Sequence, residues 1–411
     1  MDRLSLSSPR DPLTAGPASG RDSWLLRRLA GRMHGLRRGS LRLVLPDGSV
    51  RLLRGEEPGQ EAELRVASPR LALRTLLGGS VGFAESYLAG EWDSPDLVAL
   101  LELLDRNAEA FGRGYYGSGA LALLRRLRHA LRSNSRPGAR RNIKAHYDLG
   151  NEFFAAWLDP TMLYSAAMFE AGEEDLERAQ LAKCRHLARM IELGPGHRLL
   201  EIGGGWGGFA ILVARELGCR VTSLTISPAQ AELARRRVHE AGLAERVEIR
   251  LEDYRDTRGR FDRIASIEMF EAVGEAYWPV FFDQLRERLA PGGIAGLQVI
   301  TIAEPWFERY RANPDFIQTY IFPGGMLPSP GALDAQYRRA GLRQTAVRCF
   351  GADYARTLRL WRERFEAAWA ELRGQGLDER FRRLWRYYLA YCETGFRTGS
   401  IDVRQVRLEH G

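Results

Sequence analysis

The chain has 411 residues, enough for two domains, and its 45% hydrophobic and 27% charged residues exclude a disordered or fibrous protein. The net charge of +8 makes a polyanion an expected neighbour, either nucleic acid or an anionic membrane surface. Because the sequence has no zinc finger, RNA-binding aromatic motif or clear helix-turn-helix, we favour the membrane and expect no nucleic acid partner. No apolar run approaches the roughly 18 residues that span a bilayer.

The N-terminal part is expected to hold a lead-in and a small domain. Residues 1–23 have no apolar core of signal-peptide type, so we predict a disordered lead-in and a cytoplasmic protein. In residues 24–110, three strand-like runs precede two helical patterns, which predicts a small α+β domain. The runs are SLRLVLPDG, SVRLLRG and AELRVAS, and the helical patterns are LALRTLLGG and DLVALLELLDRN.

Residues 111–142 are expected to be a linker around one basic amphipathic helix, LALLRRLRHALRS. Leucines and alanines fall on one face of this helix, and four arginines cover much of the rest. Two interpretations stay open: a solvated helix face, or docking to an anionic membrane surface. The arginines are Arg125, Arg126, Arg128 and Arg132.

Residues 143–411 are expected to form one catalytic domain. From about residue 195, buried-strand runs alternate with helical patterns, which predicts a doubly wound parallel sheet. The runs are HRLLEIG, CRVTSLTI, VEIRLED, FDRIASIEM and GGIAGLQVITI. The four cysteines are widely separated and form no CxxC pair, so we expect reduced thiols and no metal site. They are Cys184, Cys219, Cys349 and Cys392.

A glycine-rich loop, LLEIGGGWGG, follows the first of these strands at residues 199–208. The spacing is Glu201-x-Gly203-x-Gly205 rather than GxGxxG, and no Gly-Lys-Ser/Thr of a P-loop follows. After the third strand come Asp253 and Tyr254, which suit the edge and face of an adenine ring. This combination favours S-adenosylmethionine over the alternative, a nicotinamide-binding Rossmann domain.

The second strand ends in SLTISPAQ and lacks the acid that usually binds ribose hydroxyls. Thr225 and Gln230 are therefore expected to do so through neutral hydrogen bonds. Upstream, the stretch TMLYSAAMFE contains a Tyr-Ser pair expected to cover the methionine end of the cofactor. The predicted cofactor-binding residues are Tyr164, Ser165, Glu201, Gly203, Gly205, Thr225, Ile226, Gln230, Asp253 and Tyr254.

The motifs from about residue 80 onward resemble those of the cyclopropane-fatty-acyl-phospholipid synthase family. The similar segments are ESYLAGEW, HYDLGNEFFAAWLDPTMLYS, LEIGGGWGG, LTISPAQ, EDYRD, FDRIASIEMFEAVG, YIFPGGMLPS and GADYARTLRLWRERF. The resemblance implies a seven-stranded, Rossmann-like class I methyltransferase domain with an acyl-chain tunnel. It also implies a smaller N-terminal domain linked to homodimer formation and to docking on the inner membrane surface, where unsaturated phospholipid chains are the substrate.

The resemblance also implies a mechanism and its residues. The alkene attacks the sulfonium methyl, a carbocation forms, and a base held to be a bound bicarbonate removes a proton, closing a cyclopropane ring. The family binds this anion with a cysteine, a glutamate, a histidine and a tyrosine. Here the glutamate is Glu271 and the tyrosine Tyr354, whereas Ala166 replaces the cysteine and Gln298 the histidine, with Ile300 following.

Several interpretations remain open at this stage. Glu271 also fits a helix N-terminal acid and Tyr354 plain packing, while Glu268 is a further carboxylate without an assigned role. The altered anion site allows a methyl-branched product if proton loss slows. A methyltransferase acting on a small soluble acid, or a catalytically silent lipid- or cofactor-binding protein, are the alternatives. Aromatic side chains that could face the carbocation are Tyr164, Phe169, Phe270 and Tyr354.

Overall fold

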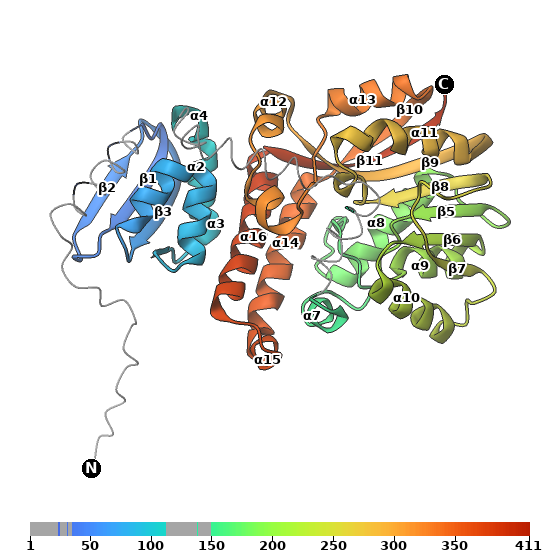
Figure 1. Ribbon diagram of the computed structural model, residues 1–411, viewed down its shortest axis with the longest axis horizontal. Coiled ribbons are helices and arrows are strands. Elements are labelled where there is room, and N and C mark those ends of the chain that lie inside the picture. The colour runs from blue at the N-terminus through green and yellow to red at the C-terminus, as the bar shows by residue number, and fades with distance from the viewer. Residues whose placement is uncertain (1–23, 25–30, 32–34, 112–137, 139–148) are drawn as a thin grey trace, which may run out of the picture. The chain divides into compact units, whose positions relative to one another are not determined.

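The computed structural model describes residues 24, 31, 35–111, 138 and 149–411, and the chain divides into two compact units, Met1–Leu121 and Ala122–Gly411 (Figure 1). The predicted lead-in and the predicted basic helix lie outside the described residues. The bounds drawn from the sequence for these segments therefore stay predictions. Among the described residues, no helix is both long enough and apolar enough to cross a membrane.

The first unit contains a four-stranded sheet in the order β2-β1-β3-β4, and the predicted strands and helices are confirmed. Strand β1 pairs antiparallel with β2 and parallel with β3. Leu41, Leu43 and Leu64 are buried on the sheet, and Leu100 and Leu103 are buried on helix α3, which contacts β1 and β3. The elements are β1 (Arg38–Val44), β2 (Val50–Arg54), β3 (Glu57–Val66), α2 (Arg70–Leu88), β4 (Trp92–Asp93), α3 (Leu97–Arg106) and α4 (Ala108–Phe111).

The second unit is built on a seven-stranded sheet in the order β10-β11-β9-β8-β5-β6-β7. Strands β5 to β9 pair in parallel, and β11 runs antiparallel to both β9 and β10. The five strands expected from the hydrophobic runs are confirmed, whereas β10 and β11 had no such prediction. The strands are β5 (Arg198–Ile202), β6 (Arg220–Thr225), β7 (Val247–Leu251), β8 (Phe261–Ile267), β9 (Leu289–Ile302), β10 (Leu342–Cys349) and β11 (Ile401–His410).

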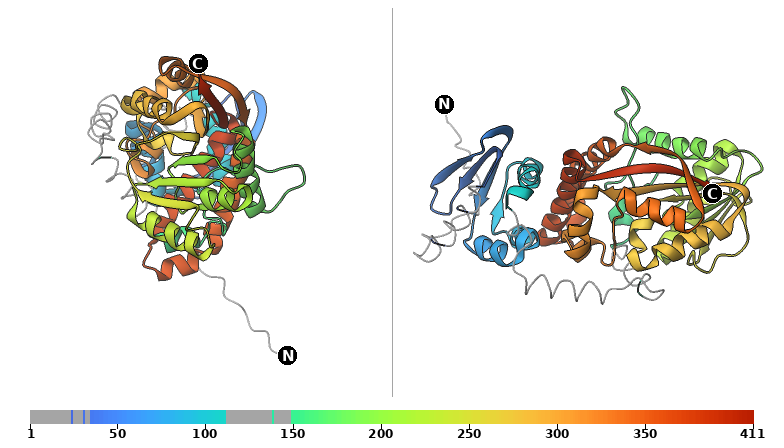
Figure 2. Two further views of the ribbon diagram at one scale, coloured as in Figure 1. Left: turned by 90° about the vertical axis from the view of Figure 1, so that its right-hand side faces the viewer. Right: turned by 90° about the horizontal axis from the view of Figure 1, so that it is seen from above.

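Helices cover both faces of this sheet (Figure 2). Successive strand residues point to opposite faces, so apolar side chains on each face pack against a separate set of helices. Leu200 and Ile202 of β5 join one apolar cluster with Phe281 of α11, whereas Leu199 joins another with Phe209 of α9. The helices are α7 (Asn151–Ala155), α8 (Leu176–Met190), α9 (Gly208–Leu217), α10 (Pro228–Glu240), α11 (Trp278–Arg288), α12 (Glu304–Ala312), α13 (Pro330–Arg339), α14 (Gly351–Ala367), α15 (Trp369–Gly374) and α16 (Glu379–Thr398). Three short helical turns are η2 (Phe270–Ala272), η3 (Glu275–Tyr277) and η4 (Ile317–Ile321).

The carboxyl ends of the parallel strands meet at one edge of the sheet, where ligands bind in open α/β folds. The glycine loop leaves β5 there, Thr225 ends β6, and Glu268 follows β8 directly. Gln298 and Ile300 lie in the second half of β9. Helices α14 and α16 lie side by side (Figures 1 and 2), and α14 carries Tyr354.

Candidate active site

The glycine loop is shaped by contacts that leave no room for side chains. A Cβ at Gly203 would lie 2.6 Å from the Met269 side chain, and Gly203 has a φ of +88°. A Cβ at Gly204 would lie 1.8 Å from the Ser223 Oγ. Gly205 also has a positive φ, +53°, but a Cβ there would meet open space. The loop thus needs glycine for packing on one side and exposes bare backbone on the other, as close approach of a ligand requires.

Glu201 is a buried carboxylate at the start of this loop. It is 3% exposed, and its Oε2 accepts a hydrogen bond of 2.5 Å from the Ser223 hydroxyl. Burial raises the pKa of Glu201 to about 7, while Ser223 and the ammonium of Lys183 lower it. Its charge is therefore only partly neutralised by the protein, and a ligand ammonium would stabilise the ionised form.

Thr225 and Gln230 are brought together as the sequence suggested. The Thr225 hydroxyl donates to the Gln230 Oε1 at 2.8 Å, and Ser227 caps the helix that carries Gln230. The Gln230 Nε2 has no hydrogen-bond partner in the part of the chain that the structure describes. Ile226, between them, is half-buried. A neutral donor is therefore available where an acid usually holds a ribose.

The predicted adenine contacts follow β7. Both oxygens of Asp253 accept hydrogen bonds from the Arg255 guanidinium, at 2.8 and 2.6 Å. The Tyr254 ring packs edge-on against Phe281 with centroids 5.4 Å apart, and the Arg255 guanidinium lies 5.5 Å from its centroid. The carboxylate is thus tied to the protein, and its role toward adenine stays a prediction.

The Tyr164-Ser165 pair lies against two elements distant in sequence. The Tyr164 and Tyr388 hydroxyls are 2.7 Å apart, and the Tyr164 ring lies 5.3 Å from Trp361. The Ser165 Oγ accepts a 2.5 Å hydrogen bond from the Nζ of Lys183, a fully buried lysine on α8. The sequence reasoning missed Lys183, although it is one of only two lysines in an arginine-rich chain.

Glu268 is half-buried and is the centre of a second polar cluster, whose other members are buried. Its Oε1 accepts hydrogen bonds from the Ala166 N–H and the Gln298 Nε2, both at 2.8 Å. Its Oε2 accepts one from the Tyr354 hydroxyl at 2.6 Å. The orientation of Gln298 is fixed because its Oε1 accepts from the Gln405 Nε2 at 2.9 Å. The site therefore brings together three residues predicted from the resemblance around a carboxylate that had no assigned role.

Glu271 lies in the turn after β8, close to this cluster. Its Oε1 accepts a 2.5 Å hydrogen bond from the Ile300 N–H, as the resemblance places both residues in one site. Its Oε2 is buried and has no hydrogen-bond partner among the described residues. Burial and then the charge of Glu268 raise the pKa of Glu271 to about 8, so it keeps its proton at neutral pH.

Of the four aromatic candidates, three lie at or near these clusters. Tyr354 joins the Glu268 cluster through its hydroxyl, Tyr164 precedes Ser165 and contacts Tyr388, and the Phe169 ring is covered by the Arg356 guanidinium at 4.2 Å. Phe270 is only 1% exposed and packs among Trp278, Phe281 and Phe282, so it belongs to the core.

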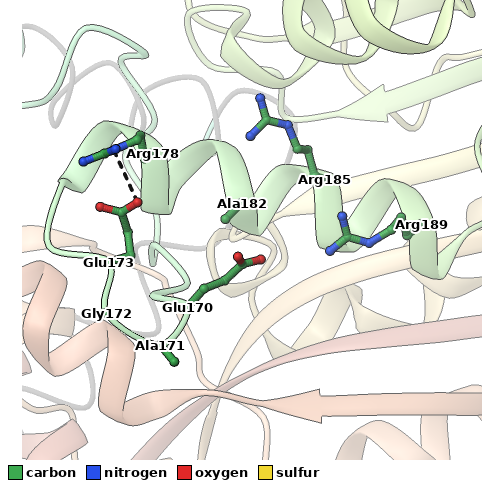
Figure 3. A pocket seen from close by; sticks show the side chains of 8 residues that line it. All are labelled: Glu170, Ala171, Gly172, Glu173, Arg178, Ala182, Arg185 and Arg189. Carbon is green, nitrogen blue, oxygen red and sulfur yellow. Dashed lines mark ion pairs between the residues drawn. The ribbon is translucent and has the colours of Figure 1, made fainter.

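A polar hollow of about 370 Å³ lies beside α8 (Figure 3). Arg178 pairs with Glu173 there at 3.3 Å, and Arg185 pairs with Glu216 at 2.7 Å. None of the predicted site residues lines it, so this hollow is separate from the two clusters. Among the described residues, no group of three or more His, Cys, Asp or Glu side chains could hold a metal ion.

Comparison with known proteins identifies the family. A profile described as "Mycolic acid cyclopropane synthetase" matches residues 134–406. The chain belongs to this family. It is 41% identical over 410 residues to the tuberculostearic acid methyltransferase UfaA1 of Mycobacterium tuberculosis, across 97% of this chain and 92% of that protein. It is 37% identical over 351 residues to the cyclopropane-fatty-acyl-phospholipid synthase of Escherichia coli, across 85% and 88% of the two chains.

Solved structures support the same family. The cyclopropane synthase MmaA2 of Mycobacterium tuberculosis aligns with a TM-score of 0.62 and 33% identity, across 66% of this chain and 97% of that one. The mycolic acid cyclopropane synthase CmaA1 complexed with SAH and CTAB aligns with a TM-score of 0.61 and 31% identity, with the same coverage. The family and the class I methyltransferase fold inferred from the sequence are confirmed, and the protein is an S-adenosylmethionine-dependent methyltransferase.

Proposed function

We propose that this enzyme transfers the methyl carbon of S-adenosylmethionine to the double bond of an unsaturated acyl chain in a membrane phospholipid. The observation that supports this most is the carboxylate pair Glu268 and Glu271 beside the glycine loop. A carbon substrate needs such a group, because methylation of an alkene leaves a carbocation that must lose a proton. Tyr164 and Trp361 offer aromatic faces nearby that could stabilise the cation.

The residues of the site have separate tasks in this proposal. S-adenosylmethionine, when bound, supplies a methyl group on a positively charged sulfur. Glu201 and the backbone of the glycine loop bind its methionine part, and Thr225 with Gln230 binds its ribose. The alkene π electrons form the new C–C bond as the C–S bond breaks. If the resulting cation loses a proton from the new methyl, the freed C–H electron pair closes a cyclopropane ring.

A methyl-branched product is a second candidate, which one observation favours. The three hydrogen bonds that Glu268 accepts stabilise its charged form and so oppose the rise in pKa that its burial causes. Slower proton loss gives time for a 1,2-hydride shift along the chain, after which an alkene with a methyl branch forms. The 41% identity to a protein named a methyltransferase rather than a cyclopropane synthase supports this candidate.

The membrane location is likewise proposed. The net charge of +8 favours an anionic bilayer, and the relative named a phospholipid synthase covers 85% of this chain. We propose a cytoplasmic enzyme, peripheral to the inner membrane surface, that forms a homodimer. Cross-linking and vesicle sedimentation at 50 and 500 mM salt check these points, and sedimentation unaffected by salt would contradict electrostatic docking.

One experiment tests the reaction itself. The purified protein is incubated with S-adenosylmethionine and vesicles of dioleoyl phosphatidylglycerol, and in parallel with free oleic acid. Mass spectrometry should find a gain of one CH₂ per modified chain in the vesicles, and ¹³C NMR separates ring methylene carbons from a branched alkene. Methylation of the free acid alone would move the assignment to a soluble substrate.

A further inference from the structure

Glu268 has a backbone conformation that costs energy. It follows β8 with a φ of +50°, one of three described non-glycine residues in the left-handed region, and its N–H donates to the Gln298 carbonyl at 2.8 Å. A side chain with a Cβ is sterically strained in this region. Residues held in such conformations cluster at functional sites, where the surrounding contacts fix them. Here the strain directs a carboxylate into the buried cluster.

The donors around that carboxylate are the ones the resemblance assigned to bicarbonate. The Ala166 N–H, the Gln298 amide and the Tyr354 hydroxyl come from three separate segments, and all three donate to Glu268. A carboxylate and a bicarbonate share the planar O–C–O group and the single negative charge that these donors recognise. The Glu268 carboxylate thus accepts the hydrogen bonds that a bound bicarbonate would otherwise accept.

The residues present therefore do not fit a bound bicarbonate. The three groups that would donate hydrogen bonds to bicarbonate already donate to Glu268. An added anion would be repelled by the charge of Glu268, and the buried Oε2 of Glu271 would offer it no positive charge. Resting on the function proposed above, we propose that the Glu268 carboxylate is itself the base that removes the proton after methyl transfer, and that the enzyme needs no bicarbonate.

The charges around Glu268 are consistent with this role. Burial raises the pKa of Glu268, and the Tyr354 hydroxyl, the Lys183 ammonium, the Ala166 N–H and Gln298 lower it. Glu271 accepts only one hydrogen bond from a neighbouring group and keeps its proton at neutral pH. Because two adjacent buried carboxyls resist double ionisation, the one with more donors, Glu268, carries the charge.

The proton transfer balances without a further reactant. Oε1 of Glu268 accepts two hydrogen bonds and Oε2 accepts one, which leaves a lone pair on Oε2. This lone pair takes the proton, and the C–H electrons form either the ring bond or the new double bond. The protonated Glu268 returns its proton to water after the product leaves.

The first test measures anion binding and needs no turnover. Titration of ¹³C-bicarbonate followed by NMR line width should show no saturable binding to the native enzyme. Glu268→Ala removes the carboxylate while leaving its donors, so this variant should bind bicarbonate in the millimolar range. Saturable binding to the native protein, competed by formate, would overturn the proposal, whether or not the phospholipid is the right substrate.

The second test measures turnover as S-adenosylhomocysteine release on dioleoyl phosphatidylglycerol vesicles. In CO₂-depleted buffer the native rate should change less than twofold when 10 mM bicarbonate is added. Glu268→Gln should lose about 10²–10⁴-fold, the usual contribution of a general base. Glu268→Ala should lose as much but recover at least tenfold with 50 mM formate or bicarbonate, because only this variant has space for the anion.

Controls separate a chemical effect from a structural one. Both variants should keep the thermal midpoint within a few degrees and the S-adenosylmethionine Kd within threefold, since Glu268 lies in the other cluster. Glu287→Gln, at an exposed position on α11, is the matched control and should have the native rate. A Glu268→Gln enzyme with near-native turnover would show that Glu268 is not the base.

Discussion

The ends of β5 and β6 and the ends of β8 and β9 lie on one edge of the same sheet, yet they carry different chemistry. The first pair offers bare glycine backbone, neutral donors and one carboxylate bonded to a hydroxyl. The second pair offers two carboxyls, one held by three donors and the other protonated. The difference suits a ligand of fixed charge on one side and a cation that forms and disappears on the other.

The largest effect is expected from a substitution that disturbs only the glycine loop, where the cofactor is proposed to bind. In Gly204→Ala the new Cβ would lie 1.8 Å from the Ser223 Oγ and 2.8 Å from the Glu201 Oε2. The loop must shift, so the Kd for S-adenosylmethionine should rise more than 100-fold by calorimetry, with a stability loss of about 1–3 kcal/mol. Gly205→Ala is the control for the stability loss alone: its Cβ meets no protein atom and should cost only about 1 kcal/mol for its positive φ. Equal stability losses in both would contradict the packing argument.

The next effect concerns the charge of Glu201. Glu201→Ala should weaken S-adenosylmethionine binding about 100-fold, because a partly desolvated carboxylate then no longer attracts the methionine ammonium. In the native protein the pKa is about 7, so affinity should fall as the pH drops below 7 and Glu201 takes up a proton. Calorimetry between pH 5.5 and 8.5 measures both effects. An affinity independent of pH would place the ammonium elsewhere.

The raised pKa of Glu271 should make the free energy of unfolding depend on pH. The pKa of Glu271 is about 8 when folded and near 4.5 when unfolded, so the folded state holds a proton that the unfolded chain releases. This contribution is complete below pH 4.5 and is lost as the pH rises through 8. In Glu271→Gln it is absent, so stability relative to the native protein should rise by about 4 kcal/mol between pH 5 and pH 9. Urea unfolding measures this, and parallel pH curves would mean that Glu271 is not shifted.

The smallest effect is expected from restoring the thiol. Ala166→Cys should change turnover less than threefold and leave the product unchanged, because the N–H of residue 166 already donates to Glu268. Residue 166 is fully buried, so the added sulfur should cost about 1 kcal/mol of stability. Rate and product analysis on vesicles measure the outcome. A large gain in ring product would show that an anion still competes for this position.

Local patterns were sufficient to predict one part of this molecule. Strands β5 to β9 are short apolar runs bounded by turns, and the glycine loop is contiguous with Glu201, so both could be inferred from neighbouring residues. The resemblance added Glu271 and Ile300, which the structure joins by a hydrogen bond. Their catalytic roles, like those of the cofactor-binding residues, remain predictions that the experiments above address.

The rest depends on contacts between distant residues. Glu268 meets donors that lie 102, 30 and 86 positions away in the chain, and no local pattern records such a meeting. Lys183 bonds to Ser165 from α8, whose sequence is that of an ordinary amphipathic helix and does not mark Lys183 as special. Strand β11 was missed because the adjacent polar residues Arg404 and Gln405 break the alternation of its apolar residues. The apolar residues of this strand that are buried in the sheet are Val403, Val406 and Leu408.

The antiparallel strand β11 has a consequence for when the enzyme becomes active. Gln405 of this strand donates to the Gln298 Oε1 and to the Lys183 carbonyl at 3.1 Å, and its own Oε1 lies 2.6 Å from a ring nitrogen of His186. Without it, the Gln298 amide could rotate and present an oxygen to Glu268 instead of a donor. The glycine loop is complete early in the chain, whereas the Gln298 amide is held only once β11 has paired with β9. If Glu268 is the base, as proposed above, an oriented base therefore forms only after synthesis has passed residue 405 and β11 has joined the sheet.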